Sequence, residues 1–443
     1  MTMKQGTLFH RLTQIKPGEV MGAMLSFLFV FILMGAWMVL RPVRDSLPSD
    51  WGDIGLAQQW MYTFIFSTIA VSVYNLLASK ISLKKLVPSI FVFFALSFLL
   101  LFSLAKSGYK PDLIGKVFYV WSSVFSLFHV SVFWSFTSQA YSKEQSKRVF
   151  GFINTGASAG AILGSLFVIN YVKNIPLEGV LLIVCVSLVA VLPLISMLNK
   201  THARAGADLD HELGHLDPNV FKGFKDLIGS KQLRSIALFI FLFTGVGTFL
   251  YSAQSEVLVD YTRAERKELL GALDLWTNLL TILLGVFAAS RISSKFGLST
   301  SLSLVPFLIA GLFLLLSLNP AVVFILGLQL VRKSGNYAIT RPAREILYTG
   351  VSREARFKTK PIIDVAVYRG GDVFWIWSIA LLGDGYLNLG LSGKLWIGAL
   401  IAALWGGLGI YLGKKHEGSS GEDDESVASN QSLPEPTLRE KQV

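Results

Sequence analysis

The sequence predicts an all-α membrane protein with about twelve transmembrane helices in two halves of six. Three observations predict this fold: the composition, the spacing of long apolar runs and an internal repeat. Hydrophobic residues make up 52% of the 443 residues and charged residues only 16%, with a mean hydropathy of +0.55. A soluble domain carries about 25% charged residues. The chain therefore has too few polar side chains to cover a water-exposed surface, and a bilayer removes that requirement.

Long apolar runs set the number of helices, because about 20 apolar residues in a helix cross the hydrocarbon core. One run, 296–331, is too long for one helix and is expected to break at Asn319-Pro320, since proline ends or kinks a helix. With that division each half holds six helices. The runs lie at 21–40, 54–79, 86–105, 117–142, 149–172, 179–199, 235–255, 269–290, 296–331, 361–383 and 395–413.

The segments between these runs predict the domain organisation. We expect an N-terminal segment at 1–17, six-helix bundles at 18–199 and 235–413, and a central loop at 200–234. The tail at 414–443 is rich in Ser, Glu and Asp and lacks aromatic residues, so it is expected to be disordered.

The distribution of positive charge predicts the orientation. Alternate connections hold 23 Lys and Arg residues on one side and 10 on the other, and the excess marks the cytoplasmic side. We therefore expect a multi-pass protein of the bacterial inner membrane with both termini and the central loop in the cytoplasm. The net charge of +11 comes from these short clusters, so no nucleic-acid partner is expected.

An internal repeat relates the two halves at an offset of 210–211 residues. Ala78-Ser-Lys-Ile-Ser-Leu-Lys84 matches Ala289-Ser-Arg-Ile-Ser-Ser-Lys295. Further pairs keep the same offset and order: Asn154 with Asp364, Gly160 with Gly370, and Gly35 with Gly245. Parallel repeats of six helices are the plan of the major facilitator fold, in which the substrate site lies between the halves near the bilayer midplane.

Several motifs resemble those of enzymes or cofactor-binding proteins, but the segments around them do not favour such sites. His211-Glu-Leu-Gly-His215 fits a zinc-protease pattern, but it lies in the central loop with Gly214 inside the would-be helix. Gly156, Gly160 and Gly164 are four residues apart, which favours close helix packing over a phosphate loop. The single Cys185 excludes a disulfide framework. We expect no enzyme activity, no cofactor and no metal.

Charged residues at membrane depth are the candidate functional residues, because such charges normally face a water-filled cavity or a partner. Clustered Arg and Lys in a low-dielectric cavity suit a phosphate or carboxylate, whereas ion pairs between helices are the structural alternative. The candidate substrate-binding cations are Arg41, Arg44, Arg332, Lys333, Arg344 and Arg369, and the candidate coupling or ion-pair residues are Asp45, Glu256, Asp274, Asp364 and Asp372.

Acidic residues and one histidine suggest a second possibility, proton coupling. Glu256 or Asp274, if partly desolvated, could titrate during transport. His129 could join such a relay, although a single histidine in a membrane helix also serves as an interhelical hydrogen-bonding group.

Three segments resemble the ATP/ADP antiporter family of nucleotide transporters. Leu40-Arg-Pro-Val-Arg-Asp-Ser-Leu47 resembles its Leu-Arg-x-x-Lys-Asp-x-Leu segment, Arg344-Glu-Ile-Leu-Tyr348 its Lys-Glu-Met-Ala-Tyr, and Lys360-Pro-Ile-Ile-Asp364 its Gly-Lys-Ala-Ala-Ile-Asp. The similarity covers most of residues 20–413 and looks closest to a bacterial branch. It implies that Arg44 stands where the family has a substrate-contacting lysine and that Glu256 lies near its helix 7 glutamate. Asp372 departs from the family, because the nucleotide carriers have a lysine there.

The sequence as a whole predicts a secondary active transporter that moves an anionic metabolite by alternating access, with phosphate-bearing, nucleotide-like compounds as candidates. Two alternatives stay open: a proton-coupled exporter of another small molecule, and a non-transporting membrane scaffold or sensor. The expected partners are the small anionic substrate and membrane lipid, and the expected state is a monomer. An ATP-driven pump is disfavoured, because no Gly-rich phosphate loop with Lys-Ser/Thr occurs.

Overall fold

The computed structural model describes residues 15–78, 80–204, 227–287, 289–348, 362–385 and 389–431, together with the single residues 225, 351 and 359. Within these residues the chain is helical and contains no strand. The first half comprises α2 (Val20–Asp45), α3 (Gly52–Ala78), α4 (Leu83–Lys106), α5 (Pro111–Ala140), α6 (Lys143–Asn170) and α7 (Leu177–Arg204). The second half comprises α9 (Lys231–Val257), α10 (Arg263–Phe287), α11 (Ala289–Leu318), α12 (Val322–Gly335), α13 (Arg341–Leu347), α15 (Tyr368–Ala380) and α16 (Leu391–Gln431).

Two of the twelve membrane-depth segments are interrupted helices. Ten helices among the described residues are long and apolar enough to cross a membrane. The remaining two segments contain π-helical turns: η5 (Asn336–Thr340) joins α12 to α13, and η6 (Ile362–Val367) and η7 (Leu381–Gly385) flank α15. The predicted break at Asn319-Pro320 is confirmed, since α11 ends at Leu318 and α12 begins at Val322.

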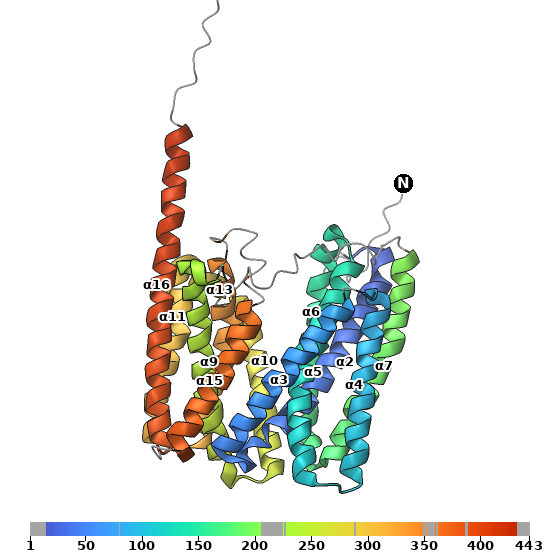
Figure 1. Ribbon diagram of the computed structural model, residues 1–443. Coiled ribbons are helices and arrows are strands. Elements are labelled where there is room, and N and C mark those ends of the chain that lie inside the picture. The colour runs from blue at the N-terminus through green and yellow to red at the C-terminus, as the bar shows by residue number, and fades with distance from the viewer. Residues whose placement is uncertain are drawn as a thin grey trace, which may run out of the picture.

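The two halves are separate bundles that meet at one end (Figure 1). The start of α2 and the extension of α16 lie at the opposite end, where the halves stand apart. Contacts between the halves involve α3 with α15, and α10 with α2 and α6. This arrangement of two six-helix bundles is the predicted major facilitator fold.

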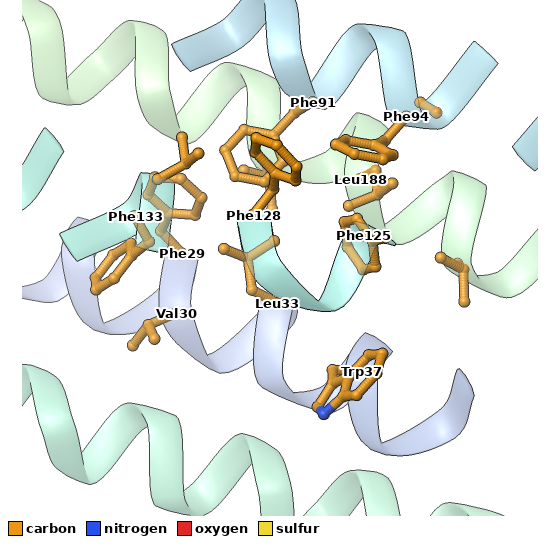
Figure 2. Close-up of a cluster of buried hydrophobic side chains, with 14 of the residues drawn as sticks. Phe29, Val30, Leu33, Trp37, Phe91, Phe94, Phe125, Phe128, Phe133 and Leu188 are labelled. Carbon is orange, nitrogen blue, oxygen red and sulfur yellow. The ribbon is translucent and has the colours of Figure 1, made fainter. Parts of the chain in front are cut away.

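Each bundle has its own aromatic core. In the first half, the ring of Phe29 on α2 makes edge contacts with Phe91 on α4, at 5.5 Å between centroids, and with Phe133 on α5, at 4.9 Å. Figure 2 shows this cluster, in which phenylalanines from three helices meet around Leu33. In the second half, Trp405 is fully buried between Phe239 and Phe243. Such edge-to-face pairs add about 0.5–1.5 kcal/mol each to area burial.

Three glycines of α6 bring its backbone against α2, as the four-residue spacing predicted. A Cβ atom on Gly156 would lie 2.8 Å from the carbonyl oxygen of Phe27, and one on Gly164 would lie 2.7 Å from the carbonyl oxygen of Gly35. A Cβ on Gly160 would overlap the carbonyl group of Phe31. Only hydrogen fits at these positions, so the glycines pack helices rather than bind phosphate.

The tail differs from the sequence prediction. Residues 414–431, expected to be disordered, continue α16 as helix to Gln431. Propagating a helix that is already packed avoids the unfavourable nucleation step, so a polar composition does not by itself end it. Glu417 also has a structural contact: its Oε1 accepts hydrogen bonds from the backbone N–H groups of Leu298, at 2.6 Å, and Ser299, at 3.2 Å. These N–H groups follow Gly297, whose φ of 77° interrupts α11.

Some predicted features lie outside the described residues. They include residues 205–224 of the central loop, with the His211 to His215 motif, and the N-terminal residues 1–14. The side chain of Asp364 is also outside the description.

Candidate functional site

A cavity of about 840 Å³ lies between the two halves, and we call it the central cavity. The first half contributes residues of α2, α3, α5 and α6, and the second half contributes residues of α9, α10, η5, α13 and α15. The charged residues that line it are Arg41, Arg44, Asp274, Arg341, Arg369 and Asp372, and its aromatic residues are Trp37, Trp60, Phe64, Tyr119, His129, Trp134, Tyr251 and Tyr337.

An ion-pair network crosses between the halves beside the central cavity. Asp274 on α10 is 3% exposed and lies 3.4 Å from Nη1 of Arg41 on α2 and 3.2 Å from Nζ of Lys333 on α12. Arg41 also lies 3.7 Å from Asp45, one turn further along α2. Buried charges are retained when they are paired, so one carboxylate here holds cations from both halves.

Arg44 lies in an aromatic setting within the first half. Its Nε and Nη2 atoms contact Oδ1 of Asp45 at 2.8 and 2.7 Å. Its guanidinium carbon is 5.2 Å from the ring centroid of Trp37 and 5.8 Å from that of Tyr119, within cation–π range. Tyr251 on α9 donates a hydrogen bond of 3.1 Å to Asp45 from the other half. The pair of Arg44 and Asp45 is thus held on several sides.

A second, smaller cavity of about 360 Å³ adjoins the central cavity, and we call it the side pocket. The two cavities share Arg41, Tyr337 and Arg341 as lining residues. The remaining residues of the side pocket, all but one from α12 to α15, are Phe243, Arg332, Lys333, Asn336, Arg344 and Tyr368. No carboxylate is among the described residues that line it.

Polar contacts close the end of the molecule opposite the start of α2 and the extension of α16. Asp50 of the first half contacts Arg266 at 2.7 Å and Arg263 at 2.9 Å. Asp53 pairs with Lys394 of α16 and accepts a 2.7 Å hydrogen bond from Ser252. We call these cross-half contacts the closure.

The structure brings most of the predicted residues together but divides them among three places. Arg41, Arg44, Asp45 and Asp274 lie at the central cavity, and Arg369 pairs with Asp372, at 3.7 Å, on its wall. Glu256 lies elsewhere, beside the closure, where it contacts Lys394 of its own half at 3.0 Å. The side pocket holds Arg332, Lys333 and Arg344.

His129 lines the central cavity and stacks on Trp37, with 4.9 Å between ring centroids. Its Nδ1 contacts the carbonyl oxygen of Ser126, at 2.9 Å, on its own helix. Among the described residues, His129 has no hydrogen-bond partner on another helix.

Sequence reasoning missed the closure residues Asp53 and Lys394 and the aromatic lining. Asp53 immediately precedes a long apolar run and Lys394 lies at the edge of another, so both resemble interfacial charges. Their burial, at 7% and 6% exposed, is visible only in three dimensions.

Comparisons with solved structures identify the fold. The chain superposes on a bacterial homologue of the human lysosomal transporter Spinster in an inward-facing, unoccupied conformation, with a TM-score of 0.56, 14% identity, and coverage of 90% of this chain and 96% of that one. A bacterial metal transporter gives a TM-score of 0.60 at 14% identity, with 90% and 99% covered. A POT family transporter in complex with 5-aminolevulinic acid gives 0.64 at 11% identity, with 89% and 96% covered. No family model and no curated sequence matches the chain.

Proposed function

We propose that this protein is a secondary transporter that moves an anionic metabolite across the membrane by alternating access. The observation that carries the proposal is the central cavity, which lies between the two repeated bundles and is lined by Arg41, Arg44, Arg341 and Arg369. Contacts of the closure join the same two bundles. A cavity rich in arginine at membrane depth favours an anion. The structural neighbours named above are transporters by their descriptions, which supports the same class of function here.

The cross-half contacts support a mechanism in which the substrate weakens the closed end. Opening that end requires Arg41 of the first half to part from Asp274 of the second, and Asp45 to part from Tyr251. An anion bound near Arg41 competes with Asp274 for the guanidinium. It thereby lowers the cost of separating the two halves.

We also propose the inner membrane as the location, with the termini in the cytoplasm and the central cavity accessible from that side. This proposal is supported by the Lys and Arg distribution and by the position of the closure opposite the start of α2 and the extension of α16. A cysteine placed at Lys200 should react only with reagent on the cytoplasmic side and one at Lys110 only with reagent outside. Labelling of both positions from one side contradicts the orientation.

The test of function begins with binding and then measures transport. Detergent-solubilised protein is screened by thermal shift against nucleotides, sugar phosphates and organic acids, because a ligand of the folded state raises stability by RT ln(1 + [L]/Kd). The nucleotides belong in the screen because of the resemblance at residues 40–47. The best anion is then measured for uptake and exchange in proteoliposomes.

Arg41→Gln removes one charge-assisted contact and should reduce uptake at least about tenfold. Lys106→Gln, which changes an exposed cation at the end of α4, is the matched control and should leave uptake within about twofold. The proposal fails if no anion stabilises the protein and none is transported.

A further inference from the structure

The side pocket has more positive charge than its neighbours neutralise. Arg41 and Lys333 share Asp274, and Arg344 contacts Glu345 at 3.4 Å. The other two cations, Arg332 and Arg341, have no ion pair with a described residue. Arg332 instead donates two hydrogen bonds, of 3.2 and 3.0 Å, to the neutral amide oxygen of Gln329.

The π-helical turn η5 explains why these cations face one pocket. Arg332 and Arg341 are nine residues apart, so a regular helix at about 100° per residue would place them about 180° apart. A π-helical turn takes up one extra residue, which brings Arg341 within about 80° of Arg332 and about 20° of Lys333. The interruption thus gathers three cations on one side of a single segment. π-Turns of this kind occur frequently at functional sites.

Gly247 on α9 provides the space into which Arg332 extends. A Cβ atom at this position would lie 3.2 Å from Nη1 of Arg332 and 3.8 Å from its guanidinium carbon. The hydrogen bonds to Gln329 therefore orient the guanidinium, and Gly247, which has no side chain, leaves room for it beside α9. This is a formed position for the guanidinium rather than a loose surface arginine.

Arg44, by contrast, already has a close carboxylate partner in Asp45 and two aromatic faces around it. A substrate anion would have to displace Asp45 to gain both nitrogens of that guanidinium. At Arg332 and Arg341 no such carboxylate has to be displaced. The energetic cost of recruiting a cation is therefore smaller in the side pocket.

We propose that the side pocket binds the phosphate group, or an oxyanion group of equal charge, of the transported molecule, while the rest of that molecule occupies the aromatic central cavity. This inference rests on the proposed function and deepens it. It assigns the substrate at least two negative charges on a compact group. It also places that group on Arg332 and Arg341 of the second half, not on Arg44 of the first.

The test uses the solubilised full chain with inorganic phosphate and pyrophosphate as probes and acetate as a singly charged reference. Pyrophosphate should raise the melting temperature in a saturable manner, and acetate at the same concentration should not. Arg332→Gln and Arg341→Gln should each weaken pyrophosphate binding by about ten- to hundredfold, as expected for the loss of a charge-assisted hydrogen bond. Arg332→Lys should restore only part of the affinity, since it lacks the planar fork. Lys106→Gln should bind as wild type.

A second variant keeps every charge and changes only the position of Arg332. Gly247→Val should displace its guanidinium and weaken pyrophosphate binding by about tenfold. Gly327→Val is the matched control, because nothing lies within 4 Å of a Cβ atom built there. Normal pyrophosphate affinity in Arg332→Gln, or a larger loss in Arg44→Gln than in Arg332→Gln, overturns the assignment. So does the absence of any stabilisation of the wild type by either probe.

One further result distinguishes a lipid headgroup from a soluble anion. Others distinguish failure of the phosphate subsite from failure of the proposed transport function. If phosphatidylglycerol, but not phosphatidylcholine, stabilises the protein through Arg332 and excludes pyrophosphate, the pocket is a lipid-headgroup site and the inference is wrong. Uptake that is unaffected by Arg332→Gln leaves the proposed function intact and removes the subsite. Binding that depends on Arg332 without any transport removes the proposed function, and with it the assignment of the bound anion to a transported molecule, and leaves only an anion site at Arg332.

Discussion

Corresponding helices of the two halves differ in their polar side chains and in the regularity of their backbone. At the repeat offset of 210 residues, Ser122 and Ser123 of α5 correspond to Arg332 and Lys333 of α12. The two serines donate hydrogen bonds to carbonyl oxygens of their own helix, those of Phe118 and Tyr119, and α5 runs without interruption. The segment from α12 to α13 carries cations and is broken by η5.

This contrast indicates that the two halves share a topology but have different functional roles. The first half supplies a regular bundle, an aromatic cavity wall and the glycine contact between α2 and α6. Among the described residues, the second half supplies the cations that have no close carboxylate partner, Arg332 and Arg341, and the three π-helical turns. A shared topology therefore does not imply shared chemistry at equivalent positions. Substitutions at matched positions test this interpretation directly.

The largest effect is expected from giving the first half a cation of the second. Ser122 is fully buried, so Ser122→Arg places an unpaired charge in the bundle and should destabilise it by about 3–5 kcal/mol. Folded yield and thermal denaturation in detergent measure the effect. Ser138→Arg, at an exposed position near the C-terminal end of the same helix, should fold normally. Equal stability of both variants would show that α5 tolerates the charge that α12 carries.

A smaller effect is expected at the glycine pair Gly160 and Gly370. Gly160→Ala forces a methyl group against the backbone of Phe31 and should cost about 1–3 kcal/mol of stability. Gly370→Ala meets nothing within 4 Å and should be neutral or slightly stabilising. The two melting temperatures give the comparison, and similar shifts for both would contradict the asymmetric packing.

The closure offers a third comparison, because Val184 stands at the repeat position of Lys394. Lys394→Val removes the partner of Asp53 and Glu256, so the closed end should open more often. A cysteine at Thr63 in the central cavity should then react about tenfold faster with an impermeant reagent added at that end. An unchanged rate would mean that the contacts of Asp50 with Arg263 and Arg266 are sufficient to keep this end closed.

The smallest effect is expected at Gly35. A Cβ atom there would make only an ordinary contact of 3.6 Å with the carbonyl oxygen of Gly160, so Gly35→Ala should change stability by less than about 0.5 kcal/mol. Its repeat partner Gly245 is restricted, since a Cβ would lie 2.7 Å from the indole of Trp375. Gly245→Ala should therefore be the more destabilising of the two in a thermal melt.

The sequence predicted the fold because bilayer length and hydropathy determine helix number directly. The sequence predicted the arrangement of the site residues less well. Arg41 and Asp274 are separated by 233 residues, so their contact depends on how α2 crosses α10. The division of the cations between two cavities depends on η5, and no residue in Asn336–Thr340 marks a π-helical turn. The contact between Glu256 and Lys394 could not be predicted either, because it depends on how the helices pack at the closed end of the molecule.

The indole rings described at the central cavity also make occupancy observable without any label. Of the ten tryptophans in the chain, Trp37, Trp60 and Trp134 line this cavity. The guanidinium of Arg44 lies over one of them, and Trp60 donates a hydrogen bond of 2.8 Å to Tyr119. A molecule that displaces water here changes the polarity around these rings, so the protein's own fluorescence emission becomes a spectroscopic report of binding.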